Sequence, residues 1–204
     1  MPKYLVLAAL MLLSCSGLAQ EVNAAVATAA AGSSSAGDFL TMPPYQGNRS
    51  AGTFGSGTVN VLAVLPFYVE HALVVRSMKA SVSTKGAVPD IFYYAGIYTT
   101  DGVLISWGRI PCGSDAQTGI VAAALSARVN LKRGLYLFAS GSDDPNQAGT
   151  GAAFGQNYQF DTDMMNMLPG SGTAANTISN GTMPLSLGTV TEPYPYSAPF
   201  VVFY

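Results

Sequence analysis

Several segments of the chain alternate apolar residues with polar or small ones, and this period of two predicts β-strands. In residues 91–99, Tyr93, Ala95 and Ile97 fall on one face, because successive side chains of a strand point to opposite sides of a sheet. The same alternation recurs along the middle of the chain. It predicts strands at residues 59–65, 73–82, 91–99, 103–110, 120–129 and 135–140.

Turn-forming residues separate these strands. Residues 100–102 read Thr-Asp-Gly, and glycine permits the positive φ of tight hairpin turns, so 91–99 and 103–110 are predicted to form a hairpin. Pro66 is predicted to end the first strand. The apolar phase of the second strand changes near Ser77, and a bulge there would keep both halves of the strand on one core.

The C-terminal part is less regular. We expect long polar loops at residues 141–155 and 169–182, a strand at 183–190 and a terminal strand at 199–204, while 156–168 is compatible with loop or a short helical turn. The near-continuous apolarity of the last segment indicates burial, either within the sheet or between subunits. About eight short strands with Gly- and Pro-rich turns predict an all-β, antiparallel β-sandwich of jelly-roll type.

The first 19 residues have the pattern of an export signal. Lys3 supplies a positive charge, residues 4–13 are apolar, and small residues precede a cleavage point after Ala19. The apolar stretch is shorter than the roughly 20 residues that span a bilayer, so no transmembrane span is expected in the mature chain. An alternative interpretation is a lipoprotein signal that ends at residue 14 and leaves Cys15 as the lipidated residue.

Residues 20–57 differ in composition from the rest. They are rich in alanine, serine, glycine and proline, which predicts a flexible or extended arm before a β-sandwich domain at residues 58–204. Such an arm would pack on its own domain or on a neighbouring subunit, and the terminal strand offers a second route to subunit packing. A homo-oligomer is therefore expected.

Charge is scarce throughout the chain. Charged residues make up 10% of the sequence, against about 25% in an average soluble domain. The nine Lys and Arg are dispersed and the net charge is −2, so a nucleic-acid partner is not expected. A polar but uncharged surface is common on secreted proteins and on virion parts, and we expect an extracellular or cell-surface location, with a virion as the alternative.

The residues needed for common catalytic chemistry are few. His71 is the only histidine and no G-x-S-x-G sequence occurs, so no Ser-His-Asp site is predicted. Loss or lipidation of Cys15 would leave Cys112 without a partner, which predicts no disulfide and a buried, inert thiol. One histidine and one available cysteine also argue against a transition-metal site. We expect no cofactor and no enzymatic activity.

Acidic residues and tyrosines in loop-like sequence are the candidate binding residues. The acidic ones are interpreted mainly as solvated loop residues and the tyrosines mainly as packing residues. The alternatives are a calcium loop within residues 141–155, a carbohydrate-active hydrolase with two converging carboxylates, and a sugar site in which rings stack against the ligand. The candidates are Asp143, Asp144, Asn146, Tyr158, Tyr194 and Tyr196.

The order of these features resembles phage tail-fibre and receptor-binding β-sandwich domains. The matching pieces are Val64-Leu65-Pro66-Phe67, residues 96–102 (GIYTTDG), residues 131–137 (LKRGLYL), Ala139-Ser140-Gly141 and the ending 199–204 (PFVVFY). The resemblance extends over residues 58–204 and implies a non-enzymatic, oligomeric part of a virion surface, although the export signal departs from it. It carries over no binding residues.

The sequence therefore favours a non-enzymatic structural or adhesion module of an extracellular or virion surface, which binds a glycan or a protein such as a cell-surface receptor. Two alternatives remain open. One is a secreted filament subunit that assembles through its arm and terminal strand. The other is a secreted carbohydrate-active hydrolase.

Overall fold

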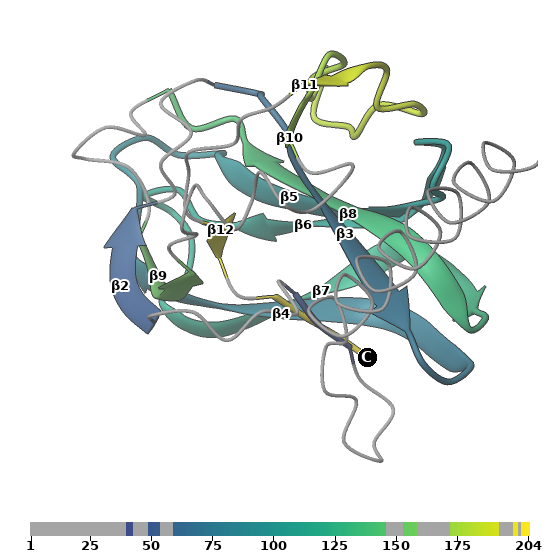
Figure 1. Cartoon of the computed structure of the whole chain (residues 1–204). Coiled ribbons are helices and arrows are strands. Elements are labelled where there is room, and N and C mark those ends of the chain that lie inside the picture. Colours follow the sequence, from purple (N-terminus) through teal and green to yellow (C-terminus); the bar gives the residue numbers. More distant parts are fainter. Residues whose placement is uncertain are drawn as a thin grey trace, which may run out of the picture.

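The computed structural model describes residues 40–42, 49–53, 59–145, 153–158, 172–191, 198–199 and 201–204. Regular structure in these ranges is entirely β, in two antiparallel sheets (Figure 1). The strands are β1 Leu40–Met42, β2 Arg49–Thr53, β3 Ala63–Val69, β4 Leu73–Thr84, β5 Phe92–Tyr98, β6 Leu104–Pro111, β7 Gly119–Leu131, β8 Gly134–Ser142, β9 Ala153–Tyr158, β10 Gly172–Ala174, β11 Val190–Thr191, β12 Ala198–Pro199 and β13 Val201–Phe203.

The two sheets face each other across one core. The first sheet has the order β11-β10-β3-β8-β5-β6. The second has the path β1-β13-β4-β9-β12, with β7 paired to the other side of β4 and β2 paired to β9. In Figure 1, β4 and β7 lie below the strands of the first sheet. The arrangement is a β-sandwich, as the alternating pattern predicts.

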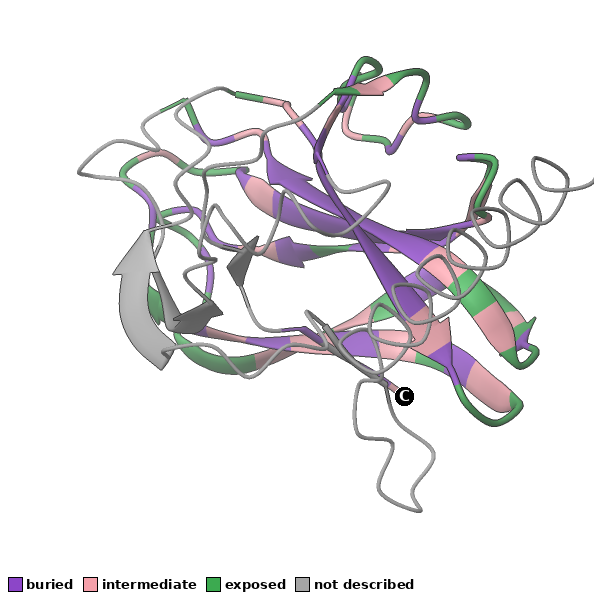
Figure 2. Cartoon of the chain, in the orientation of Figure 1, coloured by how far each residue is buried: buried purple, intermediate pink, exposed green. Residues whose placement is uncertain are grey.

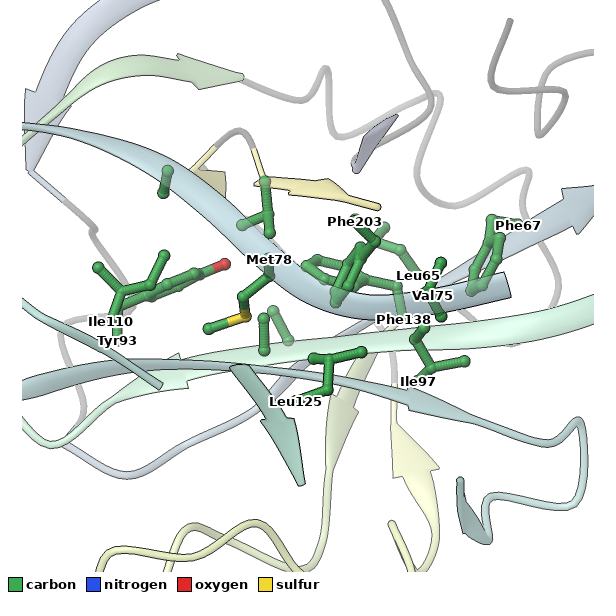
Figure 3. Packing of buried hydrophobic residues seen from close by; sticks show 14 of the residues in the cluster. Leu65, Phe67, Val75, Met78, Tyr93, Ile97, Ile110, Leu125, Phe138 and Phe203 are labelled. Carbon is green, nitrogen blue, oxygen red and sulfur yellow. The ribbon is translucent and has the colours of Figure 1, made fainter. Parts of the chain in front are cut away.

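Alternate residues of the facing strands fill the space between the sheets. Phe138 of β8 and Phe203 of β13 meet edge to face, with ring centroids 6.1 Å apart, and both are fully buried. Figure 3 shows Met78, Val75 and other aliphatic side chains in the same interior. Each fully buried side chain of this size stabilises the fold by about 1.5–3 kcal/mol, so this interior is a main source of stability.

The first sheet also has a buried outer face. Residues 175–189, between β10 and β11, cross it, and Met183 and Leu187 of this segment are buried against Tyr94 and Tyr98 of β5. The segment lies above the sheet in Figure 1, and β3, β5 and β8 are largely buried in Figure 2. Gly96 makes room for the covering segment, since a Cβ there would lie 2.9 Å from the terminal carbon of Met183.

Backbone hydrogen bonds of β10 and of residues 175–189 hold this segment in place as a covering layer. Ala174 and Ile178 donate to the carbonyls of Leu62 (3.0 Å) and Asn60 (2.9 Å). At the β5–β6 turn, Leu104 donates to Leu185 O and Leu187 donates to Gly102 O, both at 2.9 Å. The covering layer is therefore tied to both ends of the sheet that it covers.

A seam of serines joins the edge of one sheet to the edge of the other. Ser106 of β6 donates to the carbonyl of Ala127 in β7 (2.8 Å) and accepts from its N–H (3.2 Å). Ser126 accepts from the Trp107 N–H (3.2 Å). The seam brings the strands close together, and a Cβ at Gly108 would lie 3.1 Å from Ala124 O.

The predicted hairpin and the predicted bulge are both confirmed. β5 pairs with β6 through the 99–103 turn, and Gly102 has φ 75° as the turn requires. The pairing of β4 with β7 shifts register between Val75 and Ser77, where the apolar phase changes. The terminal segment also contains a strand, as predicted. This strand is β13, which lies between β1 and β4, and its Val201 and Phe203 are buried.

Three predictions of local structure are wrong. β3 runs through Pro66, because β10 pairs only with residues 63–64 and leaves an edge where a missing N–H is tolerated. Residues 183–189 are not a strand, since they cross the sheet and anchor by Met183 and Leu187 instead of pairing along a ladder. The expected polar loops are interrupted: β8 continues to Ser142, and β9 and β10 lie within or near them.

Of the N-terminal arm, the structure describes only β1 and β2, which pair with β13 and β9 of the same chain. The remainder of residues 20–57 and the signal segment 1–19, including Cys15, lie outside the described residues. The jelly-roll connection of the strands and the role of the arm stay predictions.

The seam yields a test. Replacing Ser106 by alanine removes the side chain that bonds both backbone groups of Ala127, and we expect a loss of about 1–2 kcal/mol in the free energy of unfolding. Urea denaturation measures it. The matched control is Ser83→Ala, at an exposed position near the end of β4, which should leave the stability unchanged. An equal effect of the two substitutions would contradict the structural role of the seam.

Candidate ligand-binding site

Aromatic and charged side chains gather on the outer face of the first sheet, beside the β6 edge. Phe92 and Tyr94 come from β5, and Trp107 and Arg109 come from β6. The register pairs Tyr94 with Arg109 and Gly96 with Trp107, so these positions share one face of the sheet. Together with Asp143, which follows β8, these residues form what we call the edge cluster.

The rings of the edge cluster are in contact with one another. Tyr94 stacks on Trp107 with centroids 6.1 Å apart at 28°, and meets Phe92 edge-on at 6.3 Å and 63°. The guanidinium carbon of Arg109 lies 4.3 Å from the centroid of the Phe92 ring. Tyr94 is fully buried, Phe92 and Trp107 are half-buried, and Arg109 is exposed. The cluster therefore offers two partly open rings and a cation to solvent.

Asp143 holds two residues of the edge cluster in place through hydrogen bonds. One carboxylate oxygen accepts the backbone N–H of Phe92 and the other accepts the hydroxyl of Tyr94, both at 2.7 Å. Burial raises the pKa of Tyr94, and the bond to Asp143 raises it further, while nearby Arg109 acts in the opposite direction. Tyr94 therefore stays protonated and donates to Asp143 at any physiological pH.

Asp144 turns the other way. It is 2% exposed, and its backbone N–H bonds to the Ser142 hydroxyl at 3.1 Å. Its carboxylate lies near Gly86, where a Cβ would be 3.3 Å from one oxygen, and near the buried Cys112. The interpretation of Asp144 as a solvated loop residue is wrong, because β8 continues far enough to carry it into the interior. The carboxylates of Asp143 and Asp144 therefore lie on different faces of the first sheet.

The other predicted binding residues do not join the edge cluster in the described structure. Tyr158 ends β9, opposite Ala198 and Arg49, and only its backbone is described. Asn146, Tyr194 and Tyr196 lie outside the described residues. Of the two candidates whose side chains the structure describes, Asp143 belongs to the edge cluster and Asp144 does not.

The sequence analysis did not identify the other four members of the cluster as binding residues. These are Phe92, Tyr94, Trp107 and Arg109. A signal did exist: Trp107 and Arg109 are spaced by two between Ser106, Gly108 and Ile110, which places them together on the face opposite the core. The pattern does not reveal that Asp143 is their neighbour, since Asp143 lies 34 residues after Arg109 and beyond the end of another strand.

Among the described side chains, no group of three or more His, Cys, Asp or Glu is placed to hold a metal ion. His71 is exposed between β3 and β4. No stretch of the described chain forms a helix with the length and apolarity of a membrane span. Neither a scan against protein-family models nor a search of curated proteins finds a match to this chain.

The role of Asp143 can be tested with an isosteric change. Asp143→Asn replaces one acceptor with an amide group that faces a donor, so we expect a loss of about 1–3 kcal/mol in the free energy of unfolding. Chemical denaturation measures it, with Glu70→Gln at an exposed position as the control. If both variants unfold like the parent chain, Asp143 does not hold the cluster.

Cys112 is predicted to be unreactive while the chain is folded. Its thiol is fully buried, donates to Ile91 O at 3.7 Å, and has a pKa raised to about 12 by burial and by the nearby charges of Asp144 and Asp143. Only the thiolate reacts, so at pH 8.5 a thiol reagent should modify Cys112 far more slowly in the native chain than in the urea-unfolded chain, measured on the Cys112 peptide by mass spectrometry. Equal rates in the two states would contradict the buried environment of Cys112.

Proposed function

We propose that this protein is a non-enzymatic structural or adhesion module of an extracellular or virion surface, and that it binds a glycan through the edge cluster. One observation carries the proposal. The half-buried rings of Phe92 and Trp107 flank the exposed Arg109 on a rigid sheet face. Sugars have apolar C–H faces that pack on aromatic rings, and hydroxyl groups that bond to the donors of a side chain such as arginine.

The rigidity of the edge cluster favours binding. Asp143 holds Tyr94, Tyr94 stacks on Trp107, and the backbone of Phe92 is tied to the same carboxylate. A ligand that meets pre-ordered side chains loses little further conformational entropy on binding. The cluster also sits on strands rather than on a long loop, which keeps its geometry fixed.

The composition and the resemblance support the same assignment. A chain with 10% charged residues has a polar but weakly charged surface, which suits contacts with neutral hydroxyl groups. The likeness to phage receptor-binding domains implies a surface part that works as an oligomer. Repeated copies of a weak glycan site would raise the overall avidity without any new contact.

A glycan array probed with the full chain tests the proposal. We expect binding to a subset of glycans, and a loss of about tenfold or more in Trp107→Ala, because a stacking ring is removed. Trp107→Phe keeps a ring and should retain part of the affinity.

The matched control is Tyr68→Ala, which removes a half-buried aromatic residue of β3, in the same sheet and outside the edge cluster. It should bind like the parent chain. If Trp107→Ala and Tyr68→Ala behave alike, the edge cluster is not the binding site. If the folded parent chain binds no glycan on the array, glycan binding itself is ruled out.

A further inference from the structure

We propose that the glycan recognised at the edge cluster carries a carboxylate, as in uronic or sialic acids, and that Arg109 binds this group. The inference rests on the proposed glycan-binding function and narrows it to one chemical class. It follows from the way in which the guanidinium of Arg109 is held.

The first constraint on Arg109 is the ring beneath it. Its guanidinium carbon lies 4.3 Å from the centroid of Phe92, a distance at which the cation is attracted to the face of the ring. This contact uses the flat π-face of the guanidinium and not its N–H groups. The ring contact itself therefore occupies none of the N–H donors.

The second constraint is the turn beside it. Asn180 and Gly181 have φ 50° and 71°, and Ser179 and Thr182 close the turn through bonds of 3.1 and 3.0 Å between their backbone groups. A Cβ at Gly181 would lie 3.3 Å from one terminal nitrogen of Arg109, so the turn backbone passes directly beside the guanidinium. The side chain has a ring on one side and a closed turn next to it.

Asp143, the acid of the edge cluster, does not form a salt bridge with Arg109. Both oxygens of Asp143 accept short bonds from other donors, the Phe92 N–H and the Tyr94 hydroxyl. Asp143 and Arg109 act on the pKa of the Tyr94 hydroxyl in opposite directions. Among the described residues no carboxylate forms a salt bridge with Arg109, and an exposed guanidinium held in this way is suited to receive a carboxylate from a ligand.

The chemistry of the guanidinium selects the ligand. Its planar fork donates two parallel bonds to a carboxylate, which are shorter and stronger than bonds to neutral hydroxyl groups. The rings of Phe92 and Trp107 lie on the same face and would contact the apolar side of a sugar. A sugar with a carboxylate satisfies the ring contacts and the charged contact together, whereas a neutral sugar satisfies only the first.

Paired ligands that differ in one carboxylate test the inference. The full chain is titrated with sialyllactose and lactose, and with a galacturonate trisaccharide and its galactose counterpart. We expect the acidic member of at least one pair to bind about tenfold or more tightly, with a preference that falls as salt is added. Arg109→Gln should abolish the preference, and Arg109→Lys should keep only part of it.

The matched control is Arg76→Gln, at an exposed arginine of β4 in the second sheet, which should leave the preference intact. Equal affinity for both members of each pair, or no effect of Arg109→Gln, would overturn the carboxylate inference. If the carboxylate inference fails in this way but glycan binding still depends on Trp107, the proposed glycan-binding function remains supported. Tighter binding of sulfated lactose than of sialyllactose also overturns it, and no binding to any of these sugars overturns both proposals.

Discussion

Burial of the first sheet on both of its faces is the constraint on which the rest of the structure depends. In a simple sandwich each sheet has one face exposed to solvent, whereas here residues 175–189 close the outer face of the first sheet and make β5 an interior strand. Gly96 leaves room for Met183 of the covering segment, because a Cβ at this position would lie 2.9 Å from the terminal carbon of Met183. Two apolar clusters, one on each side of the sheet, then share the same strands.

The edge cluster lies where this double burial gives way to solvent. Tyr94 belongs to the covered part of the outer face, while Trp107 and Arg109, one strand further out on β6, are progressively more open. Asp143 ties the two regions together through the Tyr94 hydroxyl. The packing beneath the site therefore holds its side chains in place. No loop has to become ordered for the proposed ligand contacts to form.

The alternating pattern was sufficient to locate most of the strands between residues 59 and 142, because period two is a local property of the chain. It failed at Met183, where side chains anchor a crossing segment that has no ladder of its own. It also failed at Asp144, whose burial depends on how far β8 continues. The candidate site was the least predictable part, since Arg109, Asp143 and Gly181 meet only through strand register and the placement of a distant turn.

The serine seam between β6 and β7 has one more consequence. An open edge strand presents unpaired N–H and C=O groups to which a strand from another molecule can add, and natural sheets avoid this by covering or distorting their edges. Here the hydroxyls of Ser106 and Ser126 occupy such groups on Ala127 and Trp107. Two hydroxyl groups thus protect both sheets, along this side, against growth by unwanted strand addition.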